Sequence, residues 1–145
     1  MPTILLVDNE PDILAALSMA LEWRGYRVLL SADGKAALDQ AGKSMPDLII
    51  TDCSMPEMDG VDLCRQLKLY PALAAIPVIM VSAHAQPHRK PALWSAFFLK
   101  PVDLDAFEST VALLLSSRPL RETLRPVCSD RAMSRWAPVS SAFIS

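Results

Sequence analysis

Short apolar runs, each ending at a polar residue or a turn, alternate along this chain with longer segments in which apolar residues recur at helical spacing. The runs occupy residues 3–7, 26–30, 48–51, 77–82 and 97–99. The uninterrupted apolar runs at 3–7 and 48–51 are typical of strands that are buried on both faces. Strands that alternate with helices imply right-handed crossovers and a parallel sheet covered by helices on both sides. We therefore predict an α/β fold built on a parallel sheet.

Capping residues and helix breakers indicate where the helices begin and end. Asp12 is expected to cap the first helix and Gly25 to end it, the second helix spans 34–42 and closes at Gly42, the third spans 61–70 before Pro71, and the last spans 103–117. The segment 83–96 is different, because Pro87 and Pro91 each exclude a helix interior around them. We expect a shortened fourth helix there, beginning at or after Pro91.

Polar residues stand where the apolar runs end. Asp8, Asn9 and Glu10 follow the first run, Asp52 follows the third, Ser82 ends the fourth and Lys100 follows the fifth. In a parallel sheet these positions meet at one edge, where such folds bind their ligands. Clustered carboxylates repel one another unless a cation lies between them, and hard oxygen ligands suit Mg²⁺, which also binds phosphate. With a lysine and a hydroxyl as further donors, the set supports phosphoryl transfer to a carboxylate, and Asp52 is the natural nucleophile.

Four segments at these strand ends resemble the signature segments of response-regulator receiver domains, the CheY-like family of two-component signalling. They are LLVDNEPDI, PDLIITDCSMPEMDG, VIMVSAH and FFLKP, and they occur in the family's order. The intervals of 44 residues from Asp8 to Asp52 and 30 residues from Asp52 to Ser82 are also typical of the family. The resemblance implies a flavodoxin-like (βα)5 doubly wound parallel sheet in the strand order 2-1-3-4-5, with Asp52 as the phosphoacceptor.

The same resemblance implies further site residues and partners. Mg²⁺ would be held by Asp8, Asn9, Asp52 and the backbone carbonyl of Ser54. Ser82 and Lys100 would contact the phosphoryl group, and Phe97 would move when Ser82 is drawn toward the phosphate. Lys100–Pro101 would be a cis peptide. The donor would be a sensor histidine kinase or a histidine phosphotransfer protein, and the chain would be no enzyme but a phosphoacceptor that assists its own phosphorylation and dephosphorylation.

The sequence departs from the family pattern at two places. Family members usually carry two adjacent acids after the first strand, and the second one is a direct metal ligand; here that position is Asn9, whose uncharged amide should weaken the metal site. Glu10 could compensate through a water. The interval from Ser82 to Lys100 is 18 residues, shorter than is usual, so we do not expect the common symmetric dimer through the fourth helix and fifth strand. Cys53 is interpreted as a small buried filler.

Composition and charge exclude other classes of protein. No apolar run of about 18 residues is present and the first residues do not fit a signal peptide, so we expect a cytoplasmic protein without membrane insertion. Residues 118–145 hold five Arg and two acids, a formal charge of +3. Because the whole chain has a formal charge of −2, residues 1–117 carry −5. An acidic body argues against direct binding of nucleic acid. We predict a receiver domain over 1–117 and an Arg/Pro/Ser-containing extension over 118–145, with no output domain.

The leading hypothesis is a stand-alone response-regulator receiver in a phosphorelay, which takes a phosphoryl group on Asp52 and signals by contact with an unknown downstream protein. The alternative is a phosphorylation-independent docking module of the same fold with a weakened metal site, and Asn9 favours it. A phosphohydrolase with an aspartyl-phosphate intermediate is disfavoured, because such enzymes need a general-acid Asp where this chain has Ser54.

Overall fold

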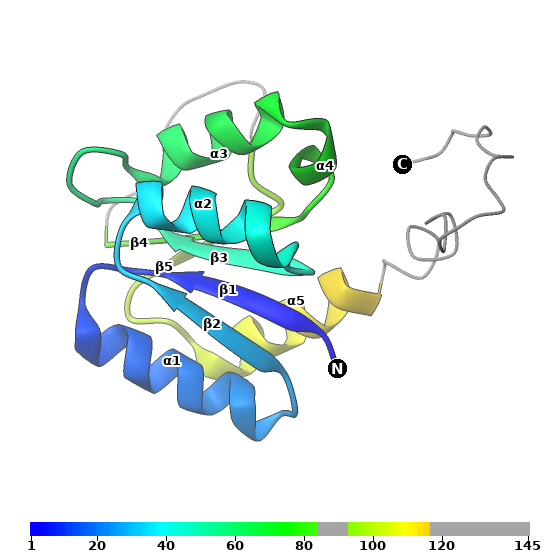
Figure 1. Cartoon of the computed structure of the whole chain (residues 1–145). Helices are drawn as coiled ribbons and strands as arrows, with labels where there is room; N and C mark the ends of the chain where they lie inside the picture. The colour runs from blue at the N-terminus through cyan, green and yellow to red at the C-terminus, as the bar shows by residue number, and fades with distance from the viewer. Residues whose placement is uncertain (84–92, 117–145) are drawn as a thin grey trace, which may run out of the picture. The chain divides into compact units, whose positions relative to one another are not determined.

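The fold is known from a computed structural model, which describes residues 1–83 and 93–116. Five parallel strands form one sheet in the order β2-β1-β3-β4-β5 (Figure 1). The elements are β1 (Thr3–Val7), α1 (Pro11–Trp23), β2 (Arg27–Ser31), α2 (Gly34–Ser44), β3 (Leu48–Asp52), α3 (Gly60–Leu69), α4 (Pro71–Ala74), β4 (Val78–Ser82), β5 (Ala96–Leu99) and α5 (Leu104–Ser116). The predicted fold class and strand order are confirmed. A shortened fourth helix is predicted to begin at or after Pro91; residues 91–92 lie outside the described residues, and 93–95 are not helical and lead directly into β5.

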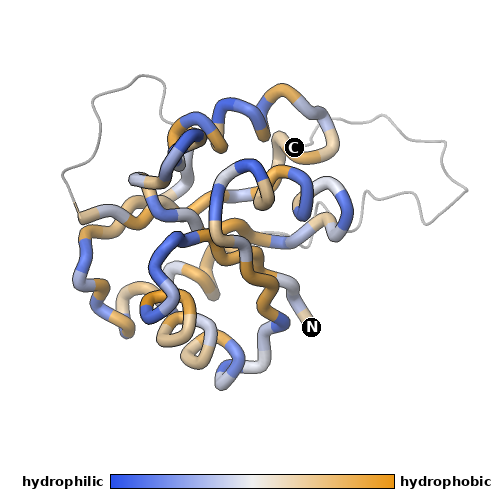
Figure 2. The backbone as a smooth tube through the Cα atoms, turned by 60° about the vertical axis from the view of Figure 1, so that its left-hand side comes forward, coloured by the Kyte–Doolittle hydropathy of each residue, from blue (hydrophilic) through white to orange (hydrophobic). Residues whose placement is uncertain are grey.

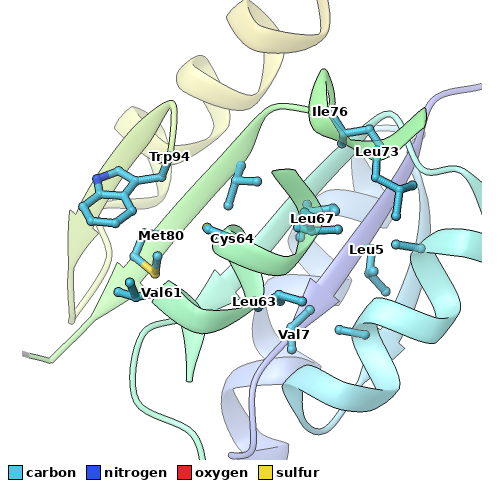
Figure 3. Packing of buried hydrophobic residues seen from close by; sticks show 14 of the residues in the cluster. Leu5, Val7, Val61, Leu63, Cys64, Leu67, Leu73, Ile76, Met80 and Trp94 are labelled. Carbon is cyan, nitrogen blue, oxygen red and sulfur yellow. The ribbon is translucent and has the colours of Figure 1, made fainter. Parts of the chain in front are cut away.

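Helices cover both faces of the sheet, α1 and α5 on one side and α2, α3 and α4 on the other (Figure 1). β1, β3 and β4, which are buried on both faces, carry largely continuous hydrophobic colouring (Figure 2). On the second side Leu63, Cys64 and Leu67 of α3 pack toward Leu5 and Val7 of β1 (Figure 3). Packing in this core fixes the position of α3 against the sheet, and it therefore also fixes the position of the loop between β3 and α3.

Strand register brings the polar residues of the sequence motifs to one edge. Val7 of β1 lies beside Thr51 of β3, and Asp52 lies beside Val81 of β4. Ser82 in turn lies beside Leu99 of β5. Since all five strands run the same way, their carboxyl ends share this edge, as the sequence predicted.

Two predicted helix ends are wrong. The first helix begins at Pro11 with Glu10 as its N-cap residue, and Asp12 lies inside its first turn. Proline suits that first position, because the N–H it lacks would have no partner within the helix. The second helix continues through Gly42 to Ser44 and ends at Met45, whose φ of 48° is left-handed. A glycine near a helix end is permissive and does not itself stop the helix.

Two other breakers act as predicted, with one addition. Gly25 has a φ of 93°, and the amides of Gly25 and Tyr26 donate back to Glu22 and Leu21, which closes α1. Pro71 does end the helix before it, but it also begins α4, a single turn that the sequence had not indicated. Lys100–Pro101 is cis, as the resemblance implied.

The loop after β3 is held tightly because Gly60, the first residue of α3, lies against that strand. Its amide donates to the Cys53 carbonyl at 2.8 Å. A Cβ at this position would overlap the Asp52 carbonyl oxygen and lie 3.0 Å from the Cys53 Cα. Only glycine therefore lets α3 begin this close to the end of β3.

The chain divides into two compact units, Met1–Val111 and Ala112–Ser145. Of the second unit the structure describes only residues 112–116, the last residues of α5. The predicted extension 118–145 lies outside the described residues. Within 1–83 and 93–116, no helix is long and apolar enough to cross a membrane.

Candidate functional site

Three carboxylates and one lysine meet at the carboxyl edge of the sheet. Asp8 and Asp52 are almost fully buried, at 3% and 5% exposure, whereas Glu10 is exposed. Lys100 Nζ lies 3.3 Å from Asp8 Oδ2, 3.0 Å from Glu10 Oε1 and 3.5 Å from Asp52 Oδ1. Ligand oxygens of the three acids lie within 4.8 Å of one another. The site therefore carries three acidic groups against one cation.

Local hydrogen bonds orient the two buried carboxylates. Asp8 Oδ1 accepts from the Glu10 amide at 2.9 Å, in the turn that leads from β1 into α1. Asp52 Oδ1 accepts from the Ser54 amide at 3.4 Å, and the Thr51 hydroxyl donates to the Asp52 carbonyl at 3.0 Å. Both side chains are thus held by the turns that follow their strands.

Burial and charge act in opposite directions on the key groups. Burial raises the pKa of Asp52, the nearby Asp8 charge raises it further, and Lys100 and the Ser54 amide offset this only in part. For Lys100, burial by itself lowers the pKa, but the Glu10 hydrogen bond and the charges of Asp52 and Asp8 outweigh it, so that the pKa is raised. The lysine therefore stays protonated beside an acid whose ionised form is disfavoured.

The predicted switch residues lie on the two neighbouring strands. Ser82 ends β4 at 1% exposure, and its carbonyl accepts from the Lys100 amide at 2.8 Å. Phe97 of β5 is half-buried and lies beside Met80 of β4. Its ring centroid is 6.4 Å from that of Trp94, a buried residue in the shortened segment between Ser82 and Lys100. Phe97 thus packs against the hydrophobic core that includes α3, and it is not in the acidic cluster.

Asn9 and Ser54 line a shallow, open depression next to the acidic cluster. Its volume is about 430 Å³, and its lining residues are Asn9, Cys53, Ser54, Met55, Pro56 and Asp59. The uncharged position of the predicted metal set, Asn9, is therefore on the solvent side of the site. Glu10, which was expected to compensate for Asn9 through a water, is in direct contact with Lys100. Its role as the N-cap residue of α1 is what places it there.

The donor set suits a hard divalent cation. Carboxylate oxygens, an amide oxygen and backbone carbonyls are the ligands that Mg²⁺ prefers, and a few protein ligands suffice because the ion keeps several waters. Three ionised acids against one lysine leave a formal charge of −2, which a divalent ion would neutralise. Asp8, Glu10 and Asp52 are therefore the groups that could hold it.

Comparison with known proteins agrees with this chemistry. The family model of the response regulator receiver domain matches residues 4–112. The transcriptional regulatory protein KdpE of Mycobacterium tuberculosis is 34% identical over 111 residues, 74% of this chain and 48% of that protein. PhoP of Bacillus subtilis, an alkaline phosphatase synthesis transcriptional regulatory protein, is 39% identical over 80 residues, 55% of this chain and 32% of PhoP. The chain thus spans half or less of the length of these two regulators.

Solved structures agree as well. The receiver domain of a histidine kinase from Syntrophus aciditrophicus superposes with a TM-score of 0.75 at 32% identity, covering 99% of this chain and all of that one. A sensor kinase receiver domain from Pseudomonas aeruginosa, solved with a magnesium ion in its active site cleft, gives a TM-score of 0.73 at 25% identity, covering 79% of this chain and 98% of that one. The cluster of Asp8, Glu10 and Asp52 matches the Mg²⁺ site of such domains.

Proposed function

The chain belongs to the response regulator receiver domain family, and from this premise we propose that its receiver domain accepts a phosphoryl group on Asp52. The donor is a sensor histidine kinase or a histidine phosphotransfer protein. The observation that carries the proposal is the buried Asp52 carboxylate, which lies with Asp8 and Glu10 around a single protonated lysine, Lys100. A buried carboxylate with other acids and a protonated lysine beside it is suited to accept a phosphoryl group.

The residues have distinct roles in the transfer. An Asp52 carboxylate oxygen forms a bond to phosphorus while the P–N bond of the donor's phosphohistidine breaks, and the imidazole leaves with the bonding electron pair. Lys100 donates to a phosphoryl oxygen and balances its charge, and the Ser82 hydroxyl donates to another. Mg²⁺ held by Asp8, Asp52, the Asn9 amide and the Ser54 carbonyl, with Glu10 beside them, would supply charge neutralisation.

The switch follows from the same residues. A phosphoryl group on Asp52 adds negative charge in the pocket and draws the Ser82 hydroxyl toward it, and Phe97 then moves into the space that this frees. The surface near β4 and β5 changes shape, and a downstream protein reads that change by direct contact. We place the receiver domain over residues 1–117 of a cytoplasmic chain, with 118–145 as an extension.

A second candidate function is a docking module of the same fold that acts without phosphorylation. Asn9 favours it, because an exposed amide replaces a charged metal ligand and leaves the cation site one charge short. Such a module would bind its partner equally well with and without a carboxylate at position 52.

Acetyl phosphate with millimolar Mg²⁺ tests the proposal. We expect intact-mass measurement to show one added phosphoryl group on the wild type and none on Asp52→Asn. Asp39→Asn is the matched control, because Asp39 is an exposed aspartate on α2 whose loss should leave the label unchanged. A wild-type chain that takes no label across a Mg²⁺ titration would overturn the proposal in favour of the docking module.

A further inference from the structure

A groove lies between α2 and α4, on the side of the sheet that α2, α3 and α4 cover (Figure 1). Its volume is about 430 Å³, within the range of sites that hold small organic molecules. Along α2 its lining residues are Lys35, Leu38, Asp39, Gly42 and Lys43. Tyr70 and Leu73 line it from the other side. None of these residues belongs to the acidic cluster at the carboxyl edge of the sheet, so the groove is a separate feature.

Hydrogen bonds fix the wall of the groove that α4 supplies. The Tyr70 carbonyl accepts from the amides of Leu73 and Ala74, each at 2.9 Å, and Lys68 Nζ donates to the Ala74 carbonyl at 2.8 Å. Leu73 is buried in the hydrophobic core (Figure 3), whereas Tyr70 is 49% exposed. The groove is therefore preformed, with an apolar floor and an aromatic side chain at its rim.

Gly42 keeps the other wall of the groove open. A Cβ built at Gly42 would meet no atom within 4 Å, so the packing of α2 does not require a glycine at this position. The interior of a helix disfavours glycine relative to alanine. What Gly42 contributes is space, because any larger side chain would project into the groove that this residue lines.

The charges along the groove favour a negatively charged ligand. Lys43 Nζ is paired with Asp39 Oδ2 at 3.1 Å, so these two charges offset each other. Lys35 has no ion pair or hydrogen bond with the residues that the structure describes. Its ammonium is therefore available to a carboxylate, for which a lysine supplies both charge and hydrogen-bond donors.

We propose that this groove binds a small aromatic carboxylate, whose ring packs against Tyr70 in the space beside Gly42 and whose charge is met by Lys35. An aromatic ring suits the exposed face of a tyrosine and the apolar floor, and one carboxylate matches the one unpaired cation. The inference goes beyond the proposed function and does not depend on it, because binding in the groove needs neither a phosphoryl group nor Mg²⁺.

Three probes with the same ring and different charges test the chemistry by NMR titration of the full chain. They are naphthoate, naphthalenemethanol and naphthylmethylamine. Naphthoate should shift the amide resonances of α2 and α4 with a dissociation constant of about a millimolar or below. The uncharged alcohol should bind about fivefold more weakly, the factor for one carboxylate near one lysine in water, and the cationic amine more weakly still. Equal binding of the three probes, or no shifts at α2 and α4, would overturn the inference.

Two substitutions test the assigned residues. Gly42→Leu should abolish naphthoate binding because its side chain fills the groove, and it should leave the fold intact because it enters open space. Ala36→Leu is the matched control, since Ala36 is an exposed residue of α2 that does not line the groove. Lys35→Met should weaken naphthoate about fivefold and leave the affinity for the alcohol unchanged.

Thermal unfolding shows whether each variant has kept its fold, and the Lys35→Met comparison decides the inference even if Gly42→Leu does not fold. If Gly42→Leu folds and binds naphthoate as tightly as Ala36→Leu does, or if Lys35→Met still prefers naphthoate to the alcohol, the assignment of the groove is wrong. None of these titrations contains a phosphodonor, so the result stands apart from the outcome of the acetyl phosphate assay.

Discussion

Replacing Glu10 by Gln should weaken Mg²⁺ binding, because Glu10 supplies a negative charge that Asn9 does not. Its carboxylate lies 3.0 Å from Lys100 Nζ, and its ligand oxygen lies within 4.8 Å of those of Asp8 and Asp52. The substitution keeps the length and shape of the side chain and one acceptor oxygen, and it removes the negative charge. Any loss of affinity therefore reports on electrostatics.

The magnitude follows from that distance. The Glu10 side chain is 57% exposed, so the dielectric constant of water is appropriate for its interactions. A divalent ion and a single carboxylate separated by 4.8 Å, the span of the acidic cluster, then attract by about 1.7 kcal/mol. Screening with a Debye length of about 8 Å reduces this to about 1 kcal/mol at physiological ionic strength. The dissociation constant should therefore rise by about 5- to 20-fold, the larger factor at low salt.

Isothermal titration calorimetry with Mg²⁺ at low and physiological salt is the assay, and Glu22→Gln is the control. Glu22 is an exposed acid twelve residues further along α1, or about 18 Å at the rise of a helix. That distance exceeds two Debye lengths at physiological salt, so its loss should leave the affinity almost unchanged. If Glu10→Gln binds Mg²⁺ as tightly as Glu22→Gln does, Glu10 is not part of the metal site and the charge argument is wrong.

Three further predictions concern stability. Gly60→Ala should lower the free energy of unfolding by about 2 kcal/mol, because the new Cβ would overlap backbone atoms that cannot move aside. Gly42→Ala, on the open side of α2, should leave the free energy of unfolding unchanged or raise it by up to about 1 kcal/mol. Thermal unfolding of the two variants tests the difference. Gly25→Ala should cost about 1 kcal/mol in urea unfolding, since alanine disfavours a φ of 93°, and an unchanged midpoint would contradict this. Asp52→Asn should melt at a higher temperature than the wild type at neutral pH in EDTA. Burial and the charge of Asp8 raise the pKa of Asp52 in the folded state, so ionisation of Asp52 destabilises the wild type as the pH rises through that pKa. Asparagine does not ionise. The higher melting temperature of Asp52→Asn should therefore disappear below the pKa of an ordinary aspartate, where Asp52 is protonated in both states.

Much of the fold and of the site was predictable from the sequence, because both depend on local patterns. The buried runs that become β1 and β3 end at Asp8 and Asp52, and a parallel sheet necessarily brings such ends to one edge. The left-handed Gly25 was predictable for a similar reason, since the conformation is cheap only for glycine.

Other features depended on contacts between segments far apart in the sequence. Gly42 and Pro71 have the same breaking tendency in any chain, yet α2 runs through the first and α4 begins at the second. Propensities of this kind are small and act locally, so the packing of the helix against the sheet decides the outcome.

The sequence by itself determined that this chain is a parallel α/β domain with Asp52 at the carboxyl end of its third strand, because strand periodicity and motif spacing are properties of contiguous residues. Only the tertiary structure decided how closely the charges at the other strand ends approach it and how deeply they are buried. Asp8, Glu10 and Lys100 reach Asp52 from other strand ends, up to 48 residues away in the sequence. Their distances, burial and pKa shifts follow from the register of the sheet and the exclusion of water at its edge, and neither can be obtained from sequence spacing alone.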